Sequence, residues 1–302
     1  MQVPTQFINI LFDSIILLFT AISLFICILT LIFMFLSKEI RRKNDETINN
    51  LLTKNTFVTI ICSSVFLLSM YVRTLYGHIN VNMTNGFDGW WCYFLGYLLY
   101  SCQVSFMYSL FIHALYRYIR IVFPNSNQQN SERIYQLIIL VKWVISFLLV
   151  LICYLLNDIR YVNDDSNCQI EVVNLRGMVT IIPIGYVIPS NLITICYIYT
   201  LYFYRKSIRI RNDIRQRTRT HRDILVLKRI STIITFVNVT GLPTLLLCIL
   251  SAILGQLPWW TRPFGWLTLS FAYGSVPFIL ILVSPQLKRL FVRRFNRIHP
   301  IG

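Results

Sequence analysis

Seven long apolar stretches constrain what this chain can fold into more than any other feature of its sequence. A helix of about 20 mainly apolar residues crosses a hydrocarbon core of about 30 Å. An open strand in lipid would leave its backbone hydrogen bonds unmade, so each stretch is expected to be a helix. The stretches cover residues 10–36, 57–76, 93–116, 134–156, 178–204, 230–254 and 264–283. The sequence therefore predicts an all-α membrane protein built as a seven-transmembrane helix bundle.

The composition of the chain agrees with this prediction. Of its 302 residues, 56% are hydrophobic and only 13% are charged, with a mean hydropathy of +0.60. Soluble domains carry about 25% charged residues, so a disordered chain, a secreted disulfide scaffold and a cytosolic enzyme are all disfavoured. No repeat or low-complexity tract divides the sequence. We therefore expect a single domain over residues 1–302, with residues 1–9 as its outer N-terminus.

The basic residues are concentrated in alternate segments between the spans. The segments after spans one, three and five, together with the C-terminal tail, hold 24 of the 28 Lys and Arg residues when adjoining span ends are included. Basic residues stay on the cytoplasmic side of a membrane, which predicts a multi-pass protein with an outer N-terminus and an inner C-terminus. The basic residues orient the spans in the membrane and attract anionic membrane lipid. These two roles explain the formal charge of +16, so no nucleic-acid partner is expected.

Two of the eight cysteines differ from the others in their location. Cys92 and Cys168 lie in outer segments, where oxidation is permitted, whereas the other six lie in apolar spans. We therefore predict a disulfide between Cys92 and Cys168 that fixes the loop before span five across the mouth of the bundle. The outer segment before span three also contains the sequon Asn82-Met83-Thr84, which predicts glycosylation of Asn82.

The third span carries a pattern typical of a known receptor family. Cys92 is followed 25 residues later by Arg117, which stands between Tyr116 and Tyr118, and Pro124 lies close by. At 1.5 Å per residue, the cysteine and the arginine lie about 37 Å apart, at opposite edges of the membrane. This pattern resembles the third helix of the rhodopsin-like (class A) G-protein-coupled receptors.

Landmarks in the other spans strengthen the resemblance. They are Trp143 in span four, Pro189 and Tyr197 in span five, Pro243 in span six, Pro277 in span seven and an amphipathic segment at 284–291. The resemblance covers essentially the whole chain. It implies a short amphipathic eighth helix within residues 284–302, a heterotrimeric G protein as partner and an extracellular ligand.

The resemblance also implies roles for particular residues. Arg117, Tyr118 and Tyr197 are expected to contact the G protein, and prolines in membrane helices are expected to act as hinges at Pro189, Pro243 and Pro277. Asp223 lies 20 residues before Pro243, at the inner end of helix six. The family places an acid there that reaches the arginine, so Asp223 is expected to pair with Arg117 in the resting state.

Several positions depart from the family pattern. Tyr116 replaces the acid before the arginine, Gly241 replaces the tryptophan of helix six, and Ile60 occupies the region of the sodium-binding aspartate. Val276 and Leu280 replace the asparagine and tyrosine of helix seven. The sequence therefore indicates a divergent member in which apolar contacts replace much of the buried polar network.

The ligand is constrained mainly by what the sequence lacks. Leu99 stands at the position of the aspartate of amine receptors and Ser270 at that of the retinal lysine, so a monoamine and retinal are excluded. Leu99, Tyr100 and Gln103 are the residues predicted to line the outer half of the pocket. The outer segments carry a net charge of −2 and several tryptophans, which leaves a cationic or amidated peptide open as the ligand.

Other functional classes fit the sequence less well. The spans contain no carboxylate pair, no His-x-x-x-His and no set of metal ligands, so we expect no catalytic residues, no metal and no cofactor. A bitter-taste-like chemosensory receptor and a ligand-gated chemoreceptor channel remain as alternatives. The channel class usually has its N-terminus inside, and the bitter-taste class generally lacks the outer disulfide.

Overall fold

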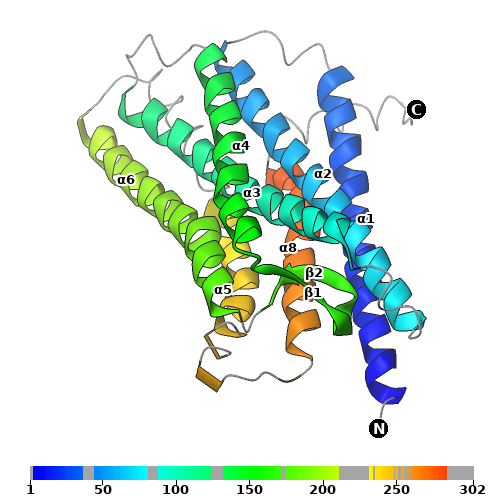
Figure 1. Cartoon of the computed structure of the whole chain (residues 1–302). Coiled ribbons are helices and arrows are strands. Elements are labelled where there is room, and N and C mark those ends of the chain that lie inside the picture. Colours follow the sequence, from blue (N-terminus) through cyan, green and yellow to red (C-terminus); the bar gives the residue numbers. More distant parts are fainter. Residues whose placement is uncertain are drawn as a thin grey trace, which may run out of the picture.

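The computed structural model describes residues 3–36, 44–80, 88–123, 132–171, 174–210, 231–233, 235–247, 249–250, 253–254, 258 and 260–283. Its elements are α1 (Val3–Leu36), α2 (Asn44–Ile79), α3 (Trp90–Val122), α4 (Glu132–Leu155), β1 (Ile159–Val162), β2 (Asn167–Ile170), α5 (Leu175–Ile182), α6 (Ile188–Ile210) and α8 (Thr261–Val283). Figure 1 shows the long helices gathered into a bundle with the small β1–β2 sheet at one end. We call this end, where α1 and α3 begin, the hairpin end.

Six helices in the described part of the chain are long and apolar enough to cross a membrane. They are Gln6–Leu36, Thr47–Ile79, Trp90–Val122, Glu132–Leu155, Leu175–Phe203 and Thr261–Leu282. Six of the seven predicted spans are therefore confirmed as helices, and most extend beyond the apolar stretch. The predicted span 230–254 is described in part, as the shorter apolar helix Ser231–Leu247, which we call the 231–247 helix. The predicted eighth helix lies outside the described residues.

The distribution of apolar side chains fits a bundle surrounded by lipid. Large apolar residues on the outer faces of α1, α4 and α6 are exposed, as Phe25 (67%), Leu140 (61%) and Ile198 (59%) show. A soluble protein would bury such side chains, whereas lipid solvates them. The chain is therefore a multi-pass helical membrane protein.

Helix α3 lies at the centre of the bundle. It crosses the other helices diagonally in Figure 1 and packs against α2, α4 and α6. Its face toward α2 and α8 contributes Phe106, Met107 and Leu110 to the largest apolar core cluster. Small buried residues such as Ser105 and Ser109 allow neighbouring helices to approach closely.

The hairpin covers the end of the bundle and is fixed to α3. Strands β1 and β2 pair antiparallel with Tyr161 opposite Cys168. Cys168 forms the predicted disulfide with Cys92, and the two Cα atoms lie 5.5 Å apart. A Cβ atom on Gly96 would lie 2.7 Å from the Cys168 carbonyl oxygen, so glycine at this position lets β2 lie directly on α3. The disulfide prediction is confirmed.

A π-helical turn at Pro183–Val187 joins α5 to α6 within the fifth span. Pro189 has no backbone N–H and cannot donate to the carbonyl of residue 185, as the regular helix requires. The backbone N–H of Ile188 instead donates to the Pro183 carbonyl, five residues earlier. Within this turn the backbone at Gly185 lies close to Val104 of α3, and Tyr186 reaches the 231–247 helix, as its contacts show below.

Candidate functional site

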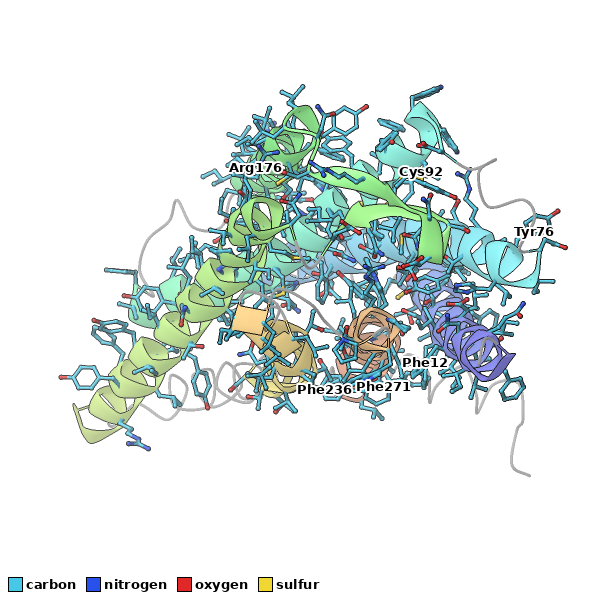
Figure 2. The ribbon with its side chains drawn as sticks, turned by 60° about the horizontal axis from the view of Figure 1, so that its bottom comes forward. Phe12, Tyr76, Cys92, Arg176, Phe236 and Phe271 are labelled. Carbon is cyan, nitrogen blue, oxygen red and sulfur yellow. A yellow bond between two sulfur atoms is a disulfide. The ribbon has the colours of Figure 1, made fainter. Side chains whose placement is uncertain are left out.

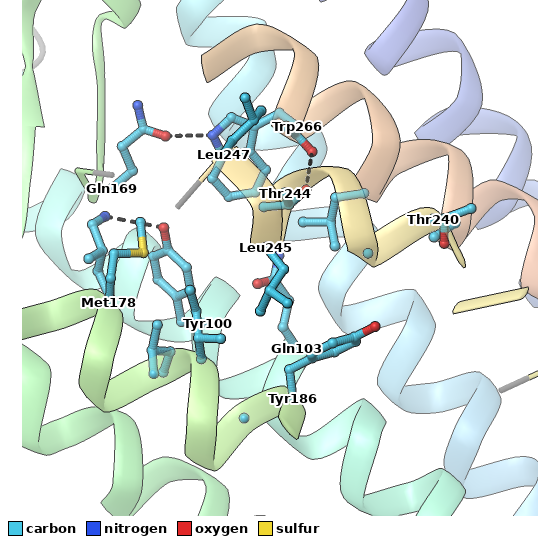
Figure 3. Close-up of a pocket in the computed structure, with 18 of the residues that line it drawn as sticks. Tyr100, Gln103, Gln169, Met178, Tyr186, Thr240, Thr244, Leu245, Leu247 and Trp266 are labelled. Atoms are coloured by element: carbon cyan, nitrogen blue, oxygen red, sulfur yellow. Dashed lines mark hydrogen bonds between the residues drawn. The ribbon is translucent and has the colours of Figure 1, made fainter. Parts of the chain in front are cut away.

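A cavity of about 230 Å³ lies beneath β2 at the hairpin end of the bundle. Its walls come from α3, from the α5–α6 span, from the 231–247 helix and from α8 (Figure 3). The lining is mostly apolar and aromatic, and includes Val104, Phe106, Met107, Met178, Ile181, Ile182, Val237, Leu245, Leu247, Leu269 and Tyr273. Helix α3 contributes Tyr100, Gln103, Val104, Phe106 and Met107 to the lining.

Two of the three predicted pocket residues line this cavity. Tyr100 and Gln103 both do so, and Figure 3 labels them among the lining side chains. Leu99 is not among the lining residues: it is buried in a separate apolar cluster with Ile16 and Leu67 of α1 and α2. Because successive helix residues are rotated by about 100°, Leu99 faces α1 and α2 while Tyr100 faces the cavity.

The mouth of the cavity holds paired charges and a link between β2 and α8. Arg262 Nη2 lies 3.7 Å from Glu171 Oε1, and its Nη1 lies 3.3 Å from Asp164 Oδ2. Trp266 Nε1 donates to the Gln169 side-chain oxygen. Sequence analysis did not assign Gln169 or Trp266 to the pocket, because no spacing rule relates a loop strand to the seventh span.

The opposite end of α3 carries Arg117. Its side chain is buried at 4% exposure, and its Nη2 donates to Asn49 Oδ1 of α2. The guanidinium lies 5.4 Å from the ring centroid of Tyr116, which packs edge-on against Tyr135 of α4. Tyr116 thus offers an aromatic face where an acid would offer a charge. The predicted partner Asp223 lies outside the described residues.

The remaining predicted contacts with a G protein lie near the same end of the bundle. Tyr118 of α3 and Tyr197 of α6 are both partly exposed there. The signal that could have identified Asn49 is its polarity at the start of an apolar helix, close to the end that carries Arg117.

The comparisons with known proteins decide the family. The model of the 7 transmembrane receptor (rhodopsin family) matches residues 53–280. The chain belongs to this receptor family. The match covers about three quarters of the receptor and includes the cavity and Arg117. None of the curated proteins compared with the receptor matches it.

The receptor fills the region of the family's sodium-binding aspartate with apolar side chains. Ile60 and Phe57 of α2 are fully buried in the main core cluster with Val276 of α8. In the same cluster the rings of Phe106 and Tyr273 have centroids 5.3 Å apart. Apolar side chains therefore pack closely in the region where the family has a polar network.

The space left by the missing tryptophan of helix six is occupied by Tyr186. A Cβ atom on Gly241 would lie 2.8 Å from Tyr186 Oη, so any larger residue at 241 would displace this ring. Tyr186 Oη donates to Asn238 Oδ1 at 3.1 Å, and Ser190 Oγ donates to the same oxygen at 2.7 Å. Helices five and six of the receptor are joined beside the cavity by these contacts.

A buried lysine lies where α2, α3 and α4 meet. Lys142 Nζ donates to Ser109 Oγ at 2.9 Å and to Asn55 Oδ1 at 3.4 Å, and it lies 4.4 Å from the Trp143 ring centroid. Trp143 Nε1 donates to the same Asn55 oxygen at 3.1 Å. Lys142 is one of the 24 basic residues counted on the inner side, but its position within an apolar run indicates a buried site.

The hairpin end also contains two buried carboxylates with partners from other elements. In α1, Asp13 Oδ2 lies 2.6 Å from His78 Nδ1 of α2. Between α4 and β1, Asp158 accepts hydrogen bonds from Asn174 Nδ2 and from the guanidinium of Arg176, whose position is labelled in Figure 2. Burial alone would raise the pKa of Asp158, but these donors hold it below its ordinary value.

Replacing Arg176 should lower the thermal stability of the receptor more than replacing its partner Asp158. Arg176→Ala would leave a fully buried carboxylate with Asn174 as its main remaining donor, whereas Asp158→Ala would leave an arginine that is 56% exposed and solvated by water. Arg176→Ala should therefore lower the melting temperature of the purified receptor more than Asp158→Ala, and the double variant should resemble Asp158→Ala. Val179→Ala, at an exposed position of α5, is the control. A larger loss from Asp158→Ala would contradict this account.

Proposed function

We propose that this receptor transmits a signal from an extracellular ligand to a heterotrimeric G protein through movement of helix six. The receptor would lie in the plasma membrane as one seven-span domain over residues 1–302, with its N-terminus outside, its C-terminus inside and helix eight after span seven. The membership of the rhodopsin family supports this reading, and it does not favour a chemosensory channel. Asn82, in the outer segment before α3, is the proposed glycosylation site and lies outside the described residues.

The cytoplasmic site would be built around Arg117. Together with Tyr118 and Tyr197, it would meet the G protein once helix six moves away from α3. Asp223 is proposed to hold Arg117 from the side of helix six, while Asn49 holds it from α2. The bond to Asn49 has a neutral partner, and a contact of this strength biases a two-state equilibrium without locking it, which a switch requires.

The observation that carries the proposal is that Tyr186 belongs both to the cavity and to the contact with helix six. It lines the cavity, and its hydroxyl donates to Asn238. A ligand in the cavity that displaces the Tyr186 ring would therefore also break a hydrogen bond to helix six. Pro189, Pro243 and Pro277 are the proposed hinges about which the helices adjust.

Replacement of Tyr186 tests this transmission directly. Tyr186→Phe keeps the ring and removes the hydrogen bond to Asn238, which is worth about 1 kcal/mol. If that bond stabilises the resting state, recruitment of a mini-G protein without added ligand should rise about fivefold at equal surface level. Tyr108→Phe is the matched control, because Tyr108 Oη donates to the Ile184 carbonyl and joins α3 to the fifth span only. Unchanged recruitment by Tyr186→Phe would contradict the proposed route.

A further inference from the structure

The described residues that line the cavity offer no unpaired charge to a ligand. The charged lining residues, among those described, are Arg262 and Glu171, which pair with each other at the mouth. Arg262 also contacts Asp164. An ionic ligand entering the apolar interior would lose its hydration shell without gaining a counter-charge, and this loss costs several kcal/mol. The cavity therefore favours an uncharged ligand.

Most polar groups of the lining already have hydrogen-bond partners within the receptor. Tyr100 Oη accepts from the Ile170 backbone N–H, and Gln169 donates to Asp165 while accepting from Trp266. The hydroxyls of Thr240, Thr244 and Thr261 bond to helix or loop groups nearby. These groups gain little from a ligand, because any new bond would replace an existing one.

Gln103 differs from these residues. It lines the cavity from α3, and its Nε2 atom is buried without a hydrogen-bond partner among the described residues. None of the hydrogen bonds in the described part of the chain uses its side-chain oxygen. A buried N–H donor without a partner is costly, and a ligand that supplies an acceptor to Nε2 removes this cost.

We propose that the cavity takes a small, uncharged, largely apolar molecule whose single hydroxyl or carbonyl group bonds to the side-chain amide of Gln103. The proposal rests on the function proposed above and specifies the class of ligand. The volume of about 230 Å³ lies below the range of about 300–1,000 Å³ for drug-sized ligands, so the molecule is compact. Aromatic rings of Tyr100, Tyr186 and Trp266 favour a ligand with a flat or ring-shaped apolar body.

A series of naphthalene compounds of nearly equal size tests this class. The probes are 2-naphthalenemethanol, 2-methylnaphthalene, 2-naphthoate and 2-naphthylmethylammonium, measured by ligand-observed NMR on the receptor in lipid nanodiscs, with empty nanodiscs subtracted. The alcohol should bind about fivefold more tightly than the hydrocarbon, because one neutral hydrogen bond is gained. Both ions should bind at least about tenfold more weakly than the alcohol.

Two variants assign the polar contact to Gln103. In Gln103→Leu the alcohol and the hydrocarbon should bind equally well, with the affinity for the hydrocarbon retained. Thr244→Val is the matched control, because Thr244 also lines the cavity but its hydroxyl is already bonded to Thr268; it should keep the preference for the alcohol. Tighter binding of either ion, absence of binding by every probe, or an unchanged alcohol preference in Gln103→Leu would overturn the proposal.

The binding measurement is independent of signalling. If the probes fail to bind while Arg117-dependent recruitment of a mini-G protein persists, the ligand class is wrong and the receptor function stands. If the alcohol binds through Gln103 but no mini-G protein is recruited, the ligand class stands and the proposed coupling is wrong.

Discussion

Arg117→Ala should abolish recruitment of a mini-G protein while leaving the amount of receptor at the cell surface nearly unchanged. The arginine is the proposed contact of the G protein, and its removal takes one hydrogen-bond donor away from the neutral Asn49 side chain of α2. A hydrogen bond to a charged group is worth ~1.5–3 kcal/mol, so the bundle loses a part of its stability that surrounding contacts can absorb. Recruitment is measured at matched surface levels.

Two variants near Arg117 separate its role in coupling from its role in packing. Arg120→Ala removes an arginine one turn further along α3, whose contact with Tyr116 Oη is 3.5 Å long, and should keep most of the recruitment. Asn49→Ala removes the hydrogen bond that Arg117 donates to α2. This variant should raise recruitment without ligand several-fold. Recruitment by Arg117→Ala at the level of the unchanged receptor would show that the G protein uses another site.

Loss of the Cys92–Cys168 disulfide should strongly reduce the receptor at the cell surface. The bond closes a loop with a sequence separation of 76, for which chain entropy predicts a stabilisation of ~4 kcal/mol within a range of ~0–5 kcal/mol. It also holds β2 over the cavity. Cys92→Ser and Cys168→Ser should each reduce surface expression to a similar, low level, as measured by flow cytometry of an N-terminal tag.

The combined variant distinguishes the disulfide from two independent cysteines. Because the two side chains form one bond, the Cys92→Ser/Cys168→Ser receptor should be no worse than either single variant. Cys196→Ala, at a free cysteine of α6, is the control and should be expressed normally. Additive losses in the combined variant would mean that each cysteine acts separately.

Features that depend on local composition could be predicted from the sequence. Apolar length predicts each described membrane helix, because lipid requires about 20 apolar residues in a helix whatever the neighbours are. The outer location of Cys92 and Cys168 predicts their bond for a similar reason, since only two cysteines occupy segments where oxidation is permitted. The resemblance to the receptor family placed the pocket at Leu99, Tyr100 and Gln103; Tyr100 and Gln103 line the cavity, and Leu99 does not.

Features that depend on pairing between distant elements could not be predicted. The bond from Arg117 to Asn49 joins residues 68 positions apart, and although Asn49 is recognisable as a polar residue at the start of α2, no sequence spacing pairs it with Arg117. From the sequence, Gly241 is only a replacement of the family tryptophan. In the structure, the absence of a side chain at Gly241 leaves space for the ring of Tyr186 from the fifth span. The orientation of that tyrosine depends on a π-helical turn, which sequence periodicity does not reveal.

The most direct test of the central claim is recruitment of mini-G proteins of each main class to the receptor in living cells. It is measured with and without 2-naphthalenemethanol, at equal surface levels of the unchanged receptor and of Arg117→Ala. We predict that at least one class is recruited to the unchanged receptor above background and that Arg117→Ala recruits none. Equal recruitment to both, or none to the unchanged receptor in any class, would contradict the account of a receptor that couples through Arg117.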